Sequence, residues 1–404
     1  MSGVAQVQSF VQKVLDEVGS SITRGERKLV GEIVLGISEN KSVLLSEIAR
    51  ATTDGSHEEL LRQERRLSRE LKKDGSGLDA LPGAYLAVVG SLTSTLPFIT
   101  VDGSDLSKLY GGTFEHLCFV RDGSAPGKPT RPGYWTVNIE ATDGHRQHLP
   151  LLLDVYSTHD PAYLALGEDA WNHTFRRGVE KVVFVRGRHG TWLFDRGFDS
   201  LDWMLFLFSL TLSFVVRLKK TRGVEVGDRR KPLAMTVGRL GWGLAKPHAV
   251  DVPFVDTSTH KVKYSRRAYG YAPVRVPGVD TRMWLIVVKA RKEDWYLLCN
   301  EETMDAKRAG EIVLTYILRW GSEEVTRCFK QCTGAENFRV RSLVAIRRLL
   351  FLAMLALAVQ ALLLFLNPTV AKRVMAKVQA FFQHVLFPHY RLWDGMALVL
   401  KEAT

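Results

Sequence analysis

The sequence lacks several features that would place it in a specialised class. Its 404 residues contain no low-complexity or collagen-like period, and a hydrophobic fraction of 46% excludes a mainly disordered chain. The N-terminal segment is amphipathic and contains acidic residues, without the apolar core of a signal peptide. A chain of this length predicts about two to three domains and a sizeable buried core.

Cysteine is scarce, with only four residues in the chain. Cys328 and Cys332 are spaced i, i+4 within a helical pattern, and no second pair of metal ligands stands near them. This spacing argues against a zinc site. So few cysteines indicate a reducing compartment, and we expect a cytoplasmic protein.

Acidic residues are fewer than basic ones. The 43 Asp and Glu residues stand against 55 Lys and Arg, which gives a formal net charge of +12. Such a surplus favours a polyanionic partner, either a nucleic acid or an anionic membrane surface. Ribosomal association and simple solubility fit it equally well, so the charge alone names no function.

One long hydrophobic run is present. Residues 349–366 are almost wholly apolar, interrupted only by Gln360, and their length meets the threshold for a membrane-spanning helix. A helix in the core of a soluble domain can be equally hydrophobic on all sides. Hydropathy leaves both interpretations open. A second run, 201–216, is interrupted by Ser and Thr and predicts a helix followed by a strand.

The first 80 residues show helical spacing of apolar side chains. A short helix over 44–51 is followed by a turn at 53–55, where Ser56 and Glu59 form the pattern of a capping box. The next helix is strongly basic, which resembles a helix-turn-helix unit whose second helix lies against phosphates. The alternative is a solvated basic face on an ordinary helical bundle. The basic side chains are Arg62, Arg65, Arg66, Arg69, Lys72 and Lys73.

From about residue 96 the pattern changes to strands separated by helices. Three strands, a helix, a strand, a helix and a strand form the element order of a ribonuclease H-like core. A Gly-, Pro- and Val-rich stretch over 223–300 then predicts a β-rich insertion, and helical periodicity resumes from Met304. The predicted core strands are 97–102, 134–141, 148–157, 191–195 and 213–220, with helices over 161–180 and 200–208; the predicted insertion strands are 262–264, 271–276, 284–289 and 295–299.

Two acids stand at the predicted ends of core strands. Phosphoryl transfer with divalent ions needs carboxylates that converge on two metals about 4 Å apart, and Mg²⁺ prefers oxygen ligands. Asp102 and Asp195 are placed for that task, although an acid that ends a strand is also a common turn former.

A predicted helix over 311–332 gathers a mixed set of side chains on one face. Tyr316, Arg319, Glu323 and Lys330 lie within roughly 60° of one another at about 100° per residue. Such a face suits one metal ligand flanked by phosphate contacts. The alternative is a solvated face with an Arg–Glu pair at i, i+4.

These four positions match the Tyr-Arg-Glu-Lys signature, and the chain resembles DDE transposases of the insertion-sequence-four family from about residue 95 to 366. VDGSDLSK around Asp102, LFDRGFDS around Asp195 and YILRWGSEEVTRCFK around Glu323 carry the resemblance. Asp105, Asp122 and Asp154 are rivals for the first acid. Asp102 is preferred because it ends the first predicted core strand and has the family's local context.

The resemblance implies that Asp102, Asp195 and Glu323 are catalytic and hold two Mg²⁺ ions, with Mn²⁺ as a substitute. Water would cut a phosphodiester at the transposon end, and the freed 3′-hydroxyl would attack target DNA. Tyr316, Arg319 and Lys330 would contact the phosphates, and Trp295 would stack on a flipped base in members that form hairpins. Trp295 could instead be a core aromatic. The family's hydrophobic helix packs against the sheet, so the resemblance also favours a core helix over a membrane span.

The sequence thus predicts an α/β cut-and-paste transposase: a ribonuclease H-like mixed sheet flanked by helices, with a β-rich insertion and a helical N-terminal domain. The expected partners are double-stranded DNA with terminal inverted repeats, target DNA and a second copy of the chain in a synaptic complex, in a bacterial or archaeal cytoplasm, without a membrane. The alternatives are a non-catalytic DNA-binding protein derived from a transposase and a single-pass membrane protein. The predicted divisions are 1–90 (DNA binding), 96–222 and 301–366 (catalysis), 223–300 (insertion) and 367–404 (C-terminal helices, dimerisation).

Overall fold

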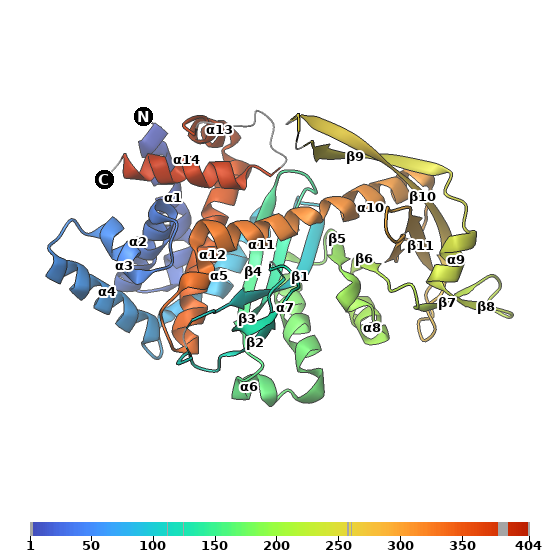
Figure 1. Ribbon diagram of the computed structural model, residues 1–404, viewed down its shortest axis with the longest axis horizontal. Coiled ribbons are helices and arrows are strands. Elements are labelled where there is room, and N and C mark those ends of the chain that lie inside the picture. The colour runs from blue at the N-terminus through green and yellow to red at the C-terminus, as the bar shows by residue number, and fades with distance from the viewer. Residues whose placement is uncertain are drawn as a thin grey trace.

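The computed structural model describes residues 3–110, 112–123, 125–256, 258–259, 261–378 and 387–402. Within these ranges the chain is mixed α/β, with a central sheet, flanking helices and a helical N-terminal region (Figure 1). Of the predicted C-terminal segment, residues 379–386 and 403–404 lie outside the described ranges.

The helices occupy both ends of the chain and the connections of the sheet. Their bounds are α1 Gly3–Val18, α2 Arg24–Asn40, α3 Leu45–Thr52, α4 His57–Lys72, α5 Leu81–Leu92, α6 Pro161–Leu164, α7 Ala170–Arg186, α8 Leu201–Ser209, α9 Val237–Gly243, α10 Ala306–Leu318, α11 Trp320–Thr333, α12 Leu343–Leu366, α13 Pro368–Ala376 and α14 His389–Lys401.

The strands fall into one large sheet and one small hairpin, β7 with β8. Their bounds are β1 Phe98–Ser107, β2 Cys118–Arg121, β3 Thr130–Thr142, β4 His148–Tyr156, β5 Thr191–Phe194, β6 Ser213–Arg217, β7 Gly223–Val226, β8 Leu233–Thr236, β9 His248–Val255, β10 Val262–Val274, β11 Met283–Val288 and β12 Trp295–Cys299.

The core of the large sheet has the strand order β4-β3-β1-β5-β6. β1 pairs antiparallel with β3 and parallel with β5, and β5 pairs parallel with β6. Helices α11 and α12 cover one face of this core, and α7 packs on the other. This mixed sheet is consistent with a ribonuclease H-like core, as the element order predicts.

The strands that follow β6 extend the same sheet instead of forming a separate one. β12 pairs antiparallel with β6, and the path continues through β11 and β10 to β9. The two strands predicted over 262–264 and 271–276 are one continuous strand, β10. Its polar middle, which includes Arg266 and Arg267, stays extended because it pairs with β9 along its whole first half. β9 directly precedes β10 in the chain, and the pattern of residues 248–255 does not predict the strand that supplies this pairing.

The predicted helix over 311–332 is two helices, α10 and α11, with Arg319 between them. The Ser322 backbone N–H donates to the Arg319 carbonyl at 2.8 Å, a tighter turn than an α-helix makes. Gly321 stands at this break, and glycine weakens a helix. The predicted helix over 161–180 is also broken, into α6 and α7, at Gly167, whose φ is 73°.

The N-terminal region is helical as predicted, and the capping box at the start of α4 is confirmed. Ser56 accepts from the Glu59 backbone N–H, and the Glu59 carboxylate accepts from the Ser56 N–H. The apolar sides of α1 to α5 belong to the same buried core as the sheet. Figure 1 shows these helices packed against α12 and α14.

The long hydrophobic run forms α12. Among the described residues this is the one helix long and apolar enough to cross a membrane, and most of its apolar window is buried inside the protein. It packs on β4, α2, α4 and α14. Its surroundings are therefore protein, as expected for a core helix.

Candidate active site

Asp102 and Asp195 lie side by side where the parallel pairing of β1 and β5 ends. The last pair in this ladder is Val101 with Phe194, and each acid is the next residue of its strand or of the turn after it. β5 ends there, as predicted. β1 does not, because its antiparallel pairing with β3 continues to Ser107. Asp102 is therefore a mid-strand residue, and the expectation that it ends its strand is wrong.

Glu323 reaches the same place from the first turn of α11. Arg319 connects it to the sheet: one guanidinium nitrogen lies 3.6 Å from Asp102 Oδ2, and the other lies 3.4 Å from Glu323 Oε1. The Arg319 side chain is only 12% exposed. The break between α10 and α11 thus places a buried cation between two of the predicted carboxylates.

The electrostatics of Asp102 show that the three acids act on one another. Burial raises the pKa of Asp102 to about 7, Arg319 opposes this increase, and the charges of Asp195 and Glu323 add to it. The pKa stays raised although Arg319 is close, so burial and the two neighbouring carboxylates outweigh the single positive charge. Such a group of oxygen donors suits a hard divalent cation.

The acids are not drawn together around a common point in this structure. Among the described residues, no group of three or more His, Cys, Asp or Glu side chains has the geometry to hold a metal ion. Arg319 instead lies between Asp102 and Glu323. The donor chemistry fits a divalent ion, and closure of the ligand set requires the three carboxylates to move closer together.

Tyr316 lies under the site, on α10. Its hydroxyl donates to the Phe194 carbonyl at 3.2 Å, next to Asp195 in the chain, and its side chain is buried. The Arg319 guanidinium lies 5.6 Å from the centre of its ring. Tyr316 therefore holds the end of β5 and supports Arg319.

Trp295 is the first residue of β12 and is half-buried. Its ring meets Tyr316 edge to face, with centroids 6.2 Å apart, and the Arg217 guanidinium lies 4.9 Å from its ring centre. The structure thus brings Trp295 to the border of the site, with part of its surface free.

Lys330 lies away from the three acids. Its ammonium group lies 3.2 Å from Asp105 Oδ2 and 3.4 Å from Glu336 Oε1, and its side chain is 13% exposed. Asp105, one rival for the first acid, is thereby neutralised. The other two rivals form ion pairs as well: Asp122 pairs with Arg131, and Asp154 pairs with Arg177.

The basic side chains predicted to form one face of α4 are partly exposed and partly used in contacts within the protein. Arg66 is half-buried and forms an ion pair with Glu32, so it ties α4 to α2. Arg62 pairs with Glu58 on its own helix. The exposed members are Arg62, Arg65, Arg69, Lys72 and Lys73. Figure 1 shows α4 at the outer edge of the helical region, far from β1 and β5.

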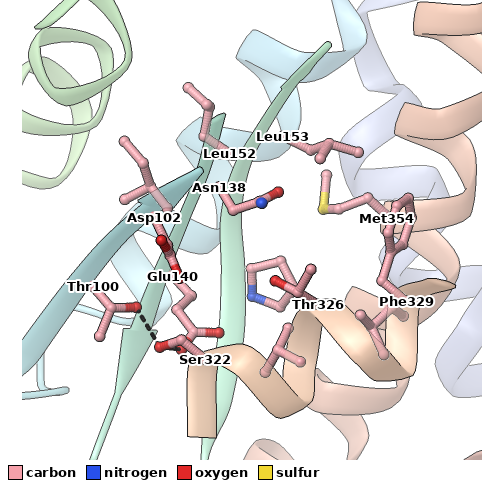
Figure 2. Close-up of a pocket in the computed structure, with 14 residues that line it drawn as sticks. Thr100, Asp102, Asn138, Glu140, Leu152, Leu153, Ser322, Thr326, Phe329 and Met354 are labelled. Carbon is pink, nitrogen blue, oxygen red and sulfur yellow. Dashed lines mark hydrogen bonds between the residues drawn. The ribbon is translucent and has the colours of Figure 1, made fainter. Parts of the chain in front are cut away.

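Sequence reasoning missed the polar residues next to Asp102 on the sheet. Thr100, Asp102, Asn138 and Glu140 lie on one face of β1 and β3, where they line a small cavity of about 30 Å³ under α11 and α12 (Figure 2). The only sequence signal was a carboxylate and an amide within the apolar alternation of residues 134–141.

The fold is mixed α/β, and Asp102, Asp195 and Glu323 lie close enough for the charges of the other two to affect Asp102. A family model described as Transposase DDE domain matches residues 144–359, more than half of the chain. The chain therefore belongs to this family, which implies a transposase function, DNA binding and a nuclease-type enzyme. The matched region contains Asp195 and Glu323, and Asp102 precedes it. No curated protein matches the chain.

Proposed function

We propose that the protein is a cut-and-paste DNA transposase of the insertion-sequence-four type. It binds terminal inverted repeats, cleaves the transposon ends and joins their 3′-hydroxyls to target DNA. One observation carries the proposal: Asp102 and Asp195 follow the last pair of the β1–β5 ladder, and Arg319 joins Glu323 to Asp102. Three acids from three elements thereby lie around the end of the β1–β5 ladder, with Arg319 between two of them.

In this proposal Asp102, Asp195 and Glu323 are the ligands of two Mg²⁺ ions, which Mn²⁺ can replace. When bound, the ions would activate the attacking water or hydroxyl and stabilise the leaving oxygen. The charges of Asp195 and Glu323 contribute to the raised pKa of Asp102, which supports a shared role for the three acids; a bound cation would displace the Asp102 proton and lower that pKa.

Arg319, Tyr316 and Trp295 would orient the DNA end. The Arg319 Nε and Nη1 atoms are buried and have no hydrogen-bond partner among the described residues. A phosphate oxygen would satisfy these donors and would draw the guanidinium away from the carboxylates. The half-buried ring of Trp295 offers a surface on which a flipped base can stack during hairpin formation.

The other regions would deliver DNA. Residues 1–90 would bind the inverted repeats through exposed side chains of α4, namely Arg62, Arg65, Arg69 and Lys72, while Arg66 holds α4 in place. Residues 96–222 and 301–366 form the catalytic part, with 223–300 as an insertion. Two copies would assemble on paired ends in the cytoplasm. Lys330, which pairs with Asp105 and Glu336, would reach a phosphate only by leaving them.

The test is cleavage of duplexes that carry the inverted repeats found next to the coding region. Glu323→Gln should bind these duplexes with unchanged affinity and lose Mg²⁺-dependent cleavage by about 10³-fold or more. Glu311→Gln is the matched control, since Glu311 is also a helical carboxylate paired with an arginine, Arg308, but lies outside the site. Equal cleavage by wild type and Glu323→Gln would contradict the site assignment.

The alternative, a transposase-derived protein that only binds DNA, has a distinct outcome in the same assay. The wild-type protein would then bind the end duplexes and cut them with neither Mg²⁺ nor Mn²⁺.

A further inference from the structure

A buried polar network lies behind the candidate site, between the first turn of α11 and the sheet. Its members are Thr100 on β1, Glu140 on β3, His148 on β4 and Ser322 on α11, and we call them the Ser322 network. All four are at least nine-tenths buried. The proposed chemistry uses none of them.

Ser322 is the centre of the network. Its hydroxyl donates to Glu140 Oε1 and lies 2.9 Å from Thr100 Oγ1. Figure 2 shows Thr100, Glu140 and Ser322 converging on one point, with Asp102 further along the same sheet face. Ser322 precedes Glu323 in the chain, and Thr100 is two residues from Asp102 on β1. The Ser322 hydroxyl therefore links the start of α11, which carries Glu323, to the segment of β1 that carries Asp102.

His148 closes the network from the other side. Its Nδ1 lies 3.2 Å from Glu140 Oε1, and its ring presses on the α11 backbone at Gly321. A Cβ atom at Gly321 would lie 2.2 Å from the His148 ring, so only glycine fits. The pairing of β3 with β4 shifts at Glu140, a bulge next to the site.

Residues at and just before the start of the C-terminal helix α14 contact His148. The rings of Phe387 and His389, at the start of α14, lie 5.7 and 6.2 Å from the His148 ring. His148 is thus held between α14 and α11, and its position fixes that of Glu140.

We propose that the Ser322 network is a positioning device that sets Glu323 opposite Asp102 for metal binding. The inference rests on the proposed function of the site. Glu323 lies in the first turn of a helix that begins at a break, where few helical hydrogen bonds restrain it. The Ser322 hydroxyl supplies the missing restraint by binding this turn to β1 and β3. Ser322, Thr100 and Glu140 are positioning residues and do not touch the ions.

The experiment combines Mn²⁺ binding with amide exchange on the full-length protein. Electron paramagnetic resonance of free Mn²⁺ gives the half-saturating concentration, and hydrogen exchange reports the opening of residues 319–326. Ser322→Ala should raise the half-saturating Mn²⁺ concentration by about 10-fold and speed exchange in this segment. Thr100→Val, which removes the other hydroxyl and keeps the shape, should act in the same direction.

Two kinds of variant make the result specific. Ser322→Thr and Thr100→Ser keep a hydroxyl and should restore Mn²⁺ binding. Ser38→Ala removes an equally buried hydroxyl, which donates to the Val34 carbonyl in α2, and should leave Mn²⁺ binding unchanged.

The outcomes separate the two proposals. If Asp195→Asn abolishes Mn²⁺ binding but Ser322→Ala and Thr100→Val bind as Ser38→Ala does, the metal site stands and the positioning role is overturned. Faster exchange without weaker Mn²⁺ binding also overturns it. If the wild-type protein binds no Mn²⁺ that Asp195→Asn removes, the proposed metal site itself fails, and the positioning role fails with it.

Discussion

At the scale of single residues, Arg319 determines the state of the candidate site. It is buried between Asp102 and Glu323 and forms ion pairs with both, while two of its donor atoms remain without a hydrogen-bond partner among the described residues. A guanidinium in this position stabilises the ionised form of both acids, and in the proposed function its two remaining donor atoms would bind a phosphate. The site therefore compensates part of its negative charge before any ion binds.

The pH dependence of stability follows from Asp102. Its pKa is raised from 3.8 to about 7, so the folded protein binds this proton more tightly than the unfolded chain does. The stability from this group is fully present below the unfolded pKa of 3.8 and is lost as the pH rises through about 7. In the absence of metal, wild type should therefore lose stability as the pH rises, and Asp102→Asn should not. Relative to wild type, the unfolding free energy of Asp102→Asn should increase by about 1–3 kcal/mol when the pH is raised from about 5 to about 8.

Urea denaturation with a chelator at both pH values measures this gain. Asp280→Asn is the control, because Asp280 is 98% exposed, and its difference from wild type should not change with pH. A constant difference for Asp102→Asn as well would disprove the raised pKa.

The sequence predicted which residues of α10 and α11 lie near one another, but it did not predict the contacts that these residues make with other elements. The positions of Tyr316, Arg319 and Glu323 along the chain place them near one another in any helical arrangement. The sequence could not show that Lys330 turns to Asp105, because that pairing joins residues 225 positions apart. Glu140 was missed for the same reason: its partners Ser322 and His148 come from other elements.

At the scale of elements, α11 is the part that the site depends on most. Its first turn carries Glu323, and its backbone at Gly321 touches the His148 ring. Local rules predicted elements well where capping or turn residues mark their ends, as at Ser56 before α4. They failed at the break before α11 and along β10, where the apolar and polar pattern does not show which backbone hydrogen bonds form.

Gly321→Ala tests how closely α11 must approach the sheet. The added methyl group would lie 2.2 Å from His148, so the ring or the helix must move. We expect a loss of about 1–3 kcal/mol in unfolding free energy, with weaker Mn²⁺ binding. Gly31→Ala is the matched control, since nothing lies within 4 Å of its added methyl group inside α2, and it should be neutral or stabilising. Equal stability of the two variants would argue against the close approach.

The exposed arginines of α4 provide a second test at this scale. Arg65 and Arg69 are exposed, whereas Arg66 is half-buried against Glu32. Each exposed arginine that neutralises a phosphate should contribute about one unit to the salt dependence of end binding. Arg69→Ala should lower that slope, measured by fluorescence anisotropy over a salt series. Arg66→Ala should mainly lower the melting temperature. An unchanged slope for Arg65→Ala and Arg69→Ala would remove α4 from the DNA-binding surface.

At the scale of the whole molecule, the two ends of the chain are built into one core. The C-terminal helix α14 packs on α1, α2 and α11, and the side chains that face these helices are buried. The sequence predicted helices here and a dimerisation role. The buried side chains of α14 contact this same chain, and the dimerisation role of residues 367–404 stays a prediction.

A substitution at Trp393 tests how much α14 contributes to the stability of the core. Trp393 is fully buried in α14, so Trp393→Ala should lower the unfolding free energy by about 3–5 kcal/mol. Trp242→Ala is the control, because Trp242 is 91% exposed and should lose almost nothing. Denaturation followed by circular dichroism compares the two. A small loss for Trp393→Ala would mean that α14 does not contribute to the common core.

The central place of α12 has a consequence for synthesis on the ribosome. The helix spans residues 343–366, and the surfaces that it covers on α2, α4 and β4 all precede it in the chain. During translation these surfaces stay uncovered until α12 has been made, since α12 emerges last of the four. A chain that ends before α12 would therefore leave the apolar side chains of α2, α4 and β4 uncovered, and exposed apolar surface of this kind favours aggregation.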